Sequence, residues 1–343
     1  MLCGLYYTNS FQNCKEANGG FFVEKFGLVL AGGGGKGAYQ IGVWRAMHEM
    51  GIEKLIGGVA GTSVGAINGA LYVAGSYEKA KMLWEHIEQD DILTEHNILQ
   101  SIQSAPDLIS VVIGQAKKAL KGIRGGFFSR SGLTRLMREN VDFDRIKASK
   151  MPFYVSAYNL DRTQVDYFDV RNADDNSEIE KMILASSALP VVFGMESLRG
   201  FHYYDGGLGD NCPVQPLYDL GFRKFIVVWL SSDSAEDIRK YTEKFSDSLL
   251  INVVPSADQG NLITGTLDFS QEGIRRRMEQ GYNDALGTFC TAFGTCDVRK
   301  GTGAVTTTST SILPTKEALK NAIRIINKLD RKSRSFLSSL LRK

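Results

Sequence analysis

Residues 26–37 read Phe-Gly-Leu-Val-Leu-Ala-Gly-Gly-Gly-Gly-Lys-Gly, and residues 55–65 read Leu-Ile-Gly-Gly-Val-Ala-Gly-Thr-Ser-Val-Gly. The first stretch opens with an apolar run of strand length, and residues 38–50 carry the apolar spacing of a helix. The second stretch predicts another strand over residues 55–61, and a helix follows over residues 64–75. This order predicts one parallel βαβ unit with both connecting loops at the same edge of the sheet. Functional groups gather at that edge in open α/β sheets.

Ser63 stands in the middle of Gly61-Thr62-Ser63-Val64-Gly65, a pattern that fits a sharp turn from a strand into a helix. Such a turn brings neighbouring backbone so close that the positions two before and two after the serine accept only glycine. It also presents the hydroxyl at a helix N-terminus, where the helix dipole favours developing negative charge. The pattern by itself fits both an ordinary turn serine and a nucleophile.

The glycine loop at residues 32–37 can turn several backbone N–H groups toward one point, where they would hold an oxyanion. Two phosphate-binding alternatives fail. A dinucleotide site needs an acidic residue about 20 positions further on, where this chain has Gly61-Thr62-Ser63. A P-loop needs Lys-Ser/Thr after the last glycine, where this chain has Ala38. Acyl transfer explains both loops together.

Three further motifs follow along the chain: Ala185–Pro190, Asp205-Gly206-Gly207 and Asn211–Val214. With the glycine loop and the Ser63 turn, they resemble the patatin-like phospholipase family, including its bacterial lipid acyl hydrolases, over about residues 24–230. The resemblance implies a three-layer α/β/α fold with a central, mostly parallel sheet, a helical cap region and a helical C-terminal extension.

The same resemblance assigns roles to individual residues. It implies Ser63 as the nucleophile, Asp205 as its base, and the amides of Gly33, Gly34 and Gly35 as the oxyanion hole. The residues that support these motifs are Gly32, Lys36, Gly37, Gly61, Gly65, Gly206 and Gly207. Lys36 is either a source of positive charge near the oxyanion or a solvated loop residue.

A Ser-His-Asp triad would need a histidine. Three of the four histidines lie on predicted helices beside the motifs: His48, His86 and His96. His202 lies on the strand that leads into the Asp205 turn, not at its tip. Asp210 is an alternative base, but the glycine pair follows Asp205. We therefore favour a Ser63–Asp205 dyad over a triad.

The resemblance implies a serine lipid acyl hydrolase of phospholipase A or lysophospholipase type, which works through an acyl-serine intermediate. Two alternatives stay open: an acyltransferase that uses the same site, and a non-catalytic lipid-binding or regulatory module. The expected partner is a lipid or lysolipid substrate, and the oligomeric state is undetermined. The chemistry needs no cofactor and no metal, and the sequence shows no metal-ligand spacing.

Charge is unevenly distributed along the 343 residues. The net charge is +2, which gives no reason to expect a nucleic-acid partner. Residues 316–343, however, hold nine Lys or Arg and two acidic residues, a net charge of +7. Residues 315–341 form a predicted basic amphipathic helix, which could pack on its own domain or make peripheral contact with a membrane.

The predicted domain organisation has three parts. Residues 1–21 are a lead segment, residues 22–255 are the catalytic domain with a helical cap near residues 91–130, and residues 256–343 are a C-terminal extension. The extension contains a linker at residues 301–311 and the basic helix at residues 315–341.

Nothing in the sequence predicts export or a membrane span. The N-terminus lacks the basic and apolar regions of a signal peptide, and no apolar stretch reaches about 18 residues. The five cysteines show no metal-ligand spacing and are interpreted as reduced thiols. We expect a cytoplasmic protein with peripheral membrane contact at most.

Overall fold

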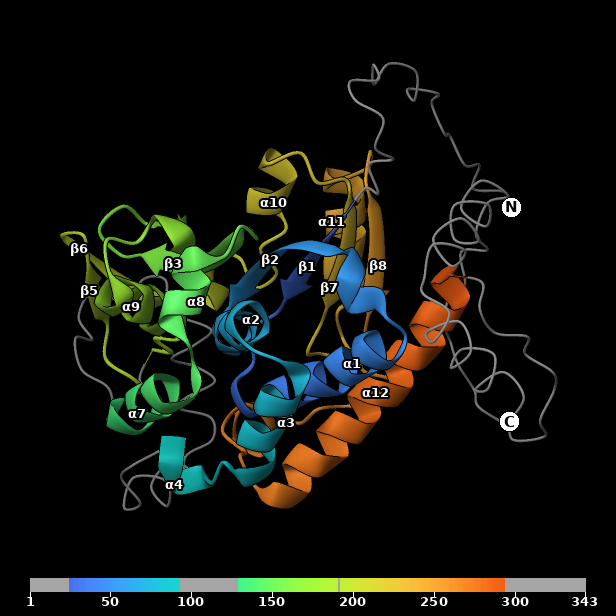
Figure 1. Ribbon diagram of the computed structural model, residues 1–343, viewed down its shortest axis with the longest axis horizontal. Coiled ribbons are helices and arrows are strands. Elements are labelled where there is room, and N and C mark those ends of the chain that lie inside the picture. Colours follow the sequence, from blue (N-terminus) through green and yellow to red (C-terminus); the bar gives the residue numbers. More distant parts are fainter. Residues whose placement is uncertain (1–24, 93–128, 191, 294–343) are drawn as a thin grey trace.

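The computed structural model describes residues 25–92, 129–190 and 192–293 (Figure 1). Four predicted features lie wholly or almost wholly outside these residues: the lead segment 1–21, the cap near residues 91–130, the linker 301–311 and the basic helix 315–341.

Within the described residues, the strands form one eight-stranded sheet in the order β5-β6-β3-β2-β1-β7-β8, with β4 paired to β3. β1, β2, β3, β7 and β8 pair in parallel, whereas β4, β5 and β6 are joined by antiparallel pairing. The predicted parallel βαβ unit and the mostly parallel sheet are confirmed. The bounds are β1 (Phe26–Leu30), β2 (Ile56–Thr62), β3 (Phe153–Asn159), β4 (Gln164–Asp169), β5 (Glu196–Leu198), β6 (Phe201–Asp205), β7 (Lys224–Val228) and β8 (Leu249–Val253).

Helices cover both faces of this sheet (Figure 1). On one face lie α1, α2, α3, α8, α9 and α12, and on the other lie α10 and α11. Tyr218 of α10 makes a ring contact with Phe245, the residue that follows α11. The predicted three-layer α/β/α architecture is therefore confirmed. The bounds are α1 (Ala38–Glu49), α2 (Val64–Ala74), α3 (Tyr77–His86), α4 (Gln89–Ile92), α7 (Ser131–Asn140), α8 (Phe143–Ala148), α9 (Asn176–Ser186), α10 (Gln215–Asp219), α11 (Ala235–Lys244) and α12 (Gln271–Phe293).

The central strands explain why the sequence shows continuous apolar runs there. All five residues of β1 are buried, as are the last four of β7, because helices cover both faces of the sheet. Burial of such apolar side chains is the main favourable term in folding. The apolar runs in β1 and β7 are thus the sequence signal of strands that lie in the middle of a parallel sheet.

Helix α12 packs along α1 at very short range, and Figure 1 shows the two helices side by side. A Cβ atom at Gly42 of α1 would overlap the carbonyl oxygen of Met278 of α12, and a Cβ atom at Gly281 of α12 would overlap that of Tyr39 of α1. Glycine on each helix lets the two backbones touch. The described part of the predicted C-terminal extension is therefore packed directly against the first helix of the βαβ unit.

Strand β3 brings together two strands from opposite directions. β2 runs parallel to β3 and ends with Thr62 opposite Ser156. β6 runs antiparallel to β3 and ends with Asp205 opposite Ala157. The carboxyl ends of β2 and β6 consequently meet beside adjacent residues of β3.

One expectation about the cysteines is wrong. Cys290 near the end of α12 is disulfide-bonded, so the interpretation of all five cysteines as reduced thiols does not hold at this position. Cys212 is a free, buried thiol, and burial raises its pKa.

Candidate active site

Ser63 occupies a strained turn between β2 and α2. Its φ is 56° and its ψ is −123°, a region that residues other than glycine rarely adopt. A Cβ atom at Gly61 would overlap the carbonyl oxygen of Gly65, and one at Gly65 would overlap that of Leu30. Both glycines are therefore required by contact between backbones. The turn places the side chain of Ser63 on the wall of a cavity at the N-terminus of α2.

Asp205, the last residue of β6, lies beside Ser63. Its side chain is buried at 5% exposure, and its carboxylate accepts a hydrogen bond from the amide of Gly207 at 2.8 Å. Burial raises the pKa of Asp205 to about 6, although the Ser63 side chain, the Gly207 amide and the charge of Arg130 lower it in part. A carboxylate with this pKa is ionised at pH 7 and is a stronger base than an exposed aspartate.

Ser186, at the end of α9, supports the turn from the other side. Its fully buried hydroxyl accepts a hydrogen bond from the amide of Ser63 at 2.9 Å. That contact uses the amide of the strained residue itself, so it stabilises a backbone conformation that is otherwise unfavourable. The sequence places Ser186 in one of the family-like motifs but gives no sign of this contact.

The residues of the glycine loop point in different directions. Gly33 and Gly34 line the cavity, and no described residue accepts a hydrogen bond from either amide. Gly35 does not line the cavity and lies against the carbonyl oxygen of Asp268. Lys36 points toward Gly265, and burial lowers its pKa. The structure therefore brings Gly33 and Gly34 to Ser63 and Asp205 and leaves Gly35 and Lys36 outside the cavity.

The first glycine of the loop, Gly32, is bound to Asn211. The amide of Gly32 donates to Asn211 Oδ1 at 3.2 Å, and Asn211 Nδ2 donates to the carbonyl oxygen of Gly32 at 3.3 Å. Asn211 Oδ1 also lies where a Cβ atom of Gly207 would be in close contact. Asn211 thus connects the glycine loop to the turn after Asp205.

Gly206 and Gly37 are glycines because of their neighbours. A Cβ atom at Gly206 would overlap the hydroxyl and the carbonyl oxygen of Ser156, and one at Gly37 would overlap the side chain of Val64. Each glycine lets one loop of the site approach another. Together with Gly61 and Gly65, they account for the glycine content of the predicted motifs.

The cavity beside these residues has a volume of about 650 Å³. Pockets of a few hundred to about 1,000 Å³ hold small organic ligands in proteins. Ser63, Asp205 and Asn211 lie on its polar side. Apart from Ser187, Thr266 and the glycines, the rest of the wall is apolar: Val64, Ile67, Leu83, Trp84, Ile87, Ile92, Leu133, Leu136, Met137, Val141, Leu189, Phe193, Leu208, Leu262, Leu267 and Phe269. A hydroxyl paired with a carboxylate on the wall of such a cavity suits a substrate with a long apolar chain.

The alternative bases lie elsewhere. His202 is 45% exposed and pairs with Asp161, and no histidine of the described residues lines the cavity. The Asp210 carboxylate accepts from the hydroxyls of Tyr167 and Tyr241, each at 2.6 Å, and does not line the cavity either. Asp205 is therefore the carboxylate in contact with Ser63.

No metal-binding arrangement is found within residues 25–92, 129–190 and 192–293, where no three His, Cys, Asp or Glu side chains are grouped to hold an ion. None of the helices that the structure describes combines the length and the apolar character needed to cross a bilayer.

A family model described as "Patatin-like phospholipase" matches residues 28–218, more than half of the chain. The chain belongs to the patatin-like phospholipase family. The predicted resemblance is confirmed, and the matched residues contain the glycine loop, Ser63, Asp205 and Asn211. They end before β7, so β8 and α12 lie outside the family match.

Several curated proteins are similar to this family member at low identity. Lysophospholipase NTE1 of Cryptococcus neoformans is 24% identical over 65% of this chain and 12% of its own length. An uncharacterised NTE family protein of Mycobacterium tuberculosis is 26% identical over 62% of this chain and 51% of its own length. Patatin-like phospholipase domain-containing protein 6 of Mus musculus is 24% identical over 64% of this chain and 14% of its own length. The chain thus matches between about an eighth and half of these relatives.

Two solved structures are also similar. VipD from Legionella pneumophila has a TM-score of 0.43 and 15% identity, over 77% of this chain and 66% of its own. The type III effector protein ExoU has a TM-score of 0.42 and 15% identity, over 93% of this chain and 72% of its own.

Proposed function

We propose that this chain is a serine lipid acyl hydrolase that cleaves a fatty-acyl ester of a phospholipid or lysophospholipid. The observation that carries the proposal is the position of Ser63, on its strained turn, beside the buried Asp205 carboxylate on the wall of an apolar cavity, where the Ser63 side chain lowers the pKa of Asp205. Family membership and the lysophospholipase relatives support lipid ester hydrolysis as the reaction class.

In the proposed reaction, Asp205 accepts the proton of Ser63 while Ser63 Oγ attacks the ester carbonyl carbon. The amides of Gly33 and Gly34 donate to the oxyanion that forms. The ester C–O bond breaks, the leaving alcohol takes the proton from Asp205, and an acyl-serine remains. Asp205 then accepts a proton from water as the water attacks the acyl-serine, and the fatty acid leaves with Ser63 protonated again.

The geometry supports each part of this mechanism. The pKa of Asp205 near 6 suits a base that works around neutral pH. Gly33 and Gly34 line the cavity, and neither amide has an acceptor among the described residues. The apolar wall offers a binding surface to the acyl chain, and no cofactor takes part.

The test is hydrolysis of a lipid panel by the wild type, Ser63→Ala and Asp205→Asn. We expect the wild type to release fatty acid and both variants to lose at least about 10³-fold in rate while staying folded, as removal of a nucleophile or its base does in serine hydrolases. Labelling of the wild type by a fluorophosphonate should mark Ser63. An unlabelled wild type, or a fully active Ser63→Ala, contradicts the proposal.

A matched control separates the dyad from a triad. His202→Ala removes the histidine closest in sequence to Asp205 but alters only an exposed contact with Asp161. The dyad predicts wild-type rates for this variant. If His202→Ala were as inactive as Ser63→Ala, Asp205 would not be the base.

A further inference from the structure

The segment Asn261–Phe269 forms part of the cavity, although it lies beyond the residues that match the family model. Leu262, Thr266, Leu267 and Phe269 all line the cavity. The segment contains a short π-helix over Leu262–Thr266, with the amide of Leu267 donating to the carbonyl of Leu262 at 2.8 Å. π-helical turns are rare and are frequent at functional sites.

This segment rests directly on the glycine loop. A Cβ atom at Gly34, whose φ is 55°, would overlap the carbonyl oxygen of Thr266, and one at Gly35 would overlap that of Asp268. In return, a Cβ atom at Gly265 would be in close contact with Lys36. Because the two backbones touch, a shift of the segment Asn261–Phe269 would move the loop that carries the Gly33 and Gly34 amides.

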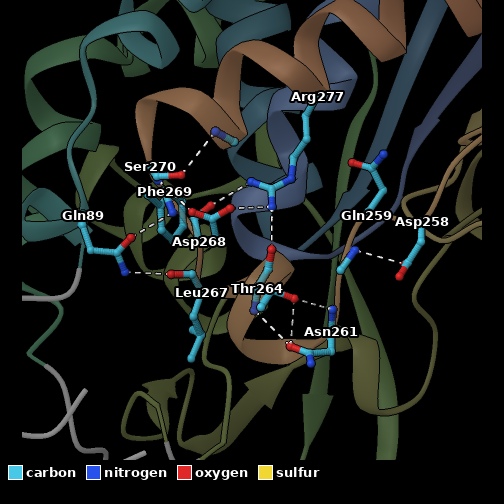
Figure 2. A network of polar contacts seen from close by, with 12 residues as sticks. Gln89, Asp258, Gln259, Asn261, Thr264, Leu267, Asp268, Phe269, Ser270 and Arg277 are labelled. Carbon is cyan, nitrogen blue, oxygen red and sulfur yellow. Dashed lines mark hydrogen bonds and ion pairs between the residues drawn. The ribbon is translucent and has the colours of Figure 1, made fainter. Parts of the chain in front are cut away.

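Arg277 of α12 holds the segment in this position, as Figure 2 shows. Its guanidinium donates to the carbonyl oxygens of Thr264 and Asp268, each at 2.9 Å, and forms an ion pair with Asp268 Oδ2 at 2.7 Å. The side chain is completely buried. A buried charge is costly unless it is paired and hydrogen-bonded, and the planar fork of arginine can reach several acceptors at once.

Gln89 holds the same segment from the opposite side, which Figure 2 also shows. Its Nε2 donates to the carbonyl oxygen of Leu267 at 2.7 Å, and its Oε1 accepts from the amide of Phe269 at 2.9 Å. The segment is therefore fastened at three carbonyls and one amide by two side chains from distant parts of the sequence.

We propose that Arg277 is a positioning residue for the oxyanion-binding loop. It acts through the segment Asn261–Phe269, which holds Gly34 and Gly35 in place, so that the amides of Gly33 and Gly34 stay aimed at the reacting carbonyl. This inference rests on the function proposed above. The loop contacts the oxyanion, whereas Leu262, Leu267 and Phe269 of the segment also line the cavity for the acyl chain. A loosened segment therefore lowers kcat by a larger factor than it raises KM.

The experiment compares Arg277→Lys with Arg276→Lys. Lysine at position 277 keeps the charge but cannot reach all three acceptors, whereas Arg276 is exposed on the same helix and serves as the matched control. We expect kcat to fall at least about tenfold in Arg277→Lys, with a smaller change in KM, because small displacements of catalytic donors cost rate steeply. Arg276→Lys should match the wild type.

Hydrogen exchange gives a second measurement that does not require activity. The amides of Lys36 and Ala38 are hydrogen-bonded within the glycine loop, and they should exchange faster in Arg277→Lys while the amides of β7 stay protected. Wild-type exchange at the loop overturns the inference, and so does faster exchange in both the loop and β7, which indicates general destabilisation. A wild type that hydrolyses no ester refutes the proposed function. The exchange data alone then decide whether Arg277 holds the glycine loop in place.

Asp268→Asn tests the same inference if Arg277→Lys fails to fold. It keeps both carbonyl acceptors of Arg277 and removes the ion pair, and its single side-chain oxygen can keep only one of the two hydrogen bonds that Asp268 accepts from Arg277 and from the Ser270 amide. The inference predicts a smaller loss of kcat in the same direction, with faster exchange at Lys36 and Ala38. Unchanged kcat together with unchanged exchange in this variant contradicts it.

Discussion

Thr62 and Asp205 are the last residues of two strands that approach β3 from opposite directions and end beside its adjacent residues Ser156 and Ala157. The Thr62 hydroxyl is hydrogen-bonded to that of Ser156 at 2.5 Å and donates to the carbonyl oxygen of Asp210 at 3.0 Å. The residue after Thr62 is Ser63. The proposed nucleophile and base therefore meet because one strand pairs with both of the strands that carry them.

The raised pKa of Asp205 predicts how activity depends on pH. Asp205 must be deprotonated to accept the Ser63 proton, so kcat/KM should be constant well above pH 6. Below about pH 6 it should fall about tenfold per pH unit. The decrease of kcat/KM at acid pH is measured by following the hydrolysis of a soluble short-chain ester across this range. If kcat/KM began to fall only near pH 4, the ordinary pKa range of an exposed aspartate, burial would not set the pKa of the base.

The same shift predicts how Asp205 affects stability. Its folded-state pKa is above its unfolded-state value, so the stabilising contribution is complete below about pH 4 and is lost as pH rises through about 6. Asparagine at this position does not titrate. The unfolding free energy of Asp205→Asn relative to wild type should therefore increase with pH across this window, by an amount on the order of 3 kcal/mol. Urea unfolding at several pH values measures this difference in unfolding free energy. A difference that does not change with pH would contradict the raised pKa of Asp205.

Asn211 offers a test of the contact between the two loops. Asn211→Ala removes both side-chain hydrogen bonds to Gly32, keeps the bond from the Gly32 amide to the Asn211 carbonyl oxygen, and leaves Ser63 and Asp205 in place. We expect kcat to fall about tenfold, because the loop that carries the proposed oxyanion donors loses its side-chain anchor. Asn283→Ala, at an exposed position of α12, is the matched control. Equal rates for the two variants would show that the link is not needed for catalysis.

Two glycines of α12 predict opposite effects of the same substitution. Gly281→Ala forces a methyl group against the carbonyl of Tyr39 and should destabilise the fold by about 1–3 kcal/mol. Gly287→Ala meets nothing within 4 Å and should stabilise the helix by about 0.5–1 kcal/mol. Thermal or urea unfolding distinguishes them. Similar values for the two variants would contradict the close packing of α12 on α1.

The apolar cavity predicts selectivity for the acyl chain. Met137 is buried and lines the cavity, so Met137→Trp reduces the space for the chain. The ratio of kcat/KM for long-chain to short-chain esters should fall, while labelling of Ser63 by a small fluorophosphonate continues. Met82→Trp, at a side chain that is 60% exposed, is the control. An unchanged ratio in Met137→Trp would place the acyl chain elsewhere.

The sequence reveals those parts of the fold and the site that depend on local chemistry. The apolar runs of β1 and β7 predict buried parallel strands, and the glycines beside Ser63 mark a turn in which backbones touch. Motif order then suggests that Asp205 belongs with Ser63, and the register of β3 shows how the chain brings them together.

The remaining features depend on contacts between distant residues, which leave no local signal. Arg277 is one of three consecutive arginines, and only the structure distinguishes the buried one from its exposed neighbours Arg275 and Arg276. The contact of Ser186 with the Ser63 amide likewise has no signal in the sequence. Helix α11 was not predicted either, since none of its residues is buried and its apolar signal is weak.

The double pairing of β3 also bears on how related chains can differ. Ser63 and Asp205 are brought together by strand pairing, whatever the number of residues between them. Insertions in the connections between strands therefore leave the pair intact. A deletion of one residue inside β3, by contrast, would separate the two strand ends by about 3.3 Å and reverse the facing of every later side chain. Length variation during evolution should therefore accumulate around this strand and spare the strand itself.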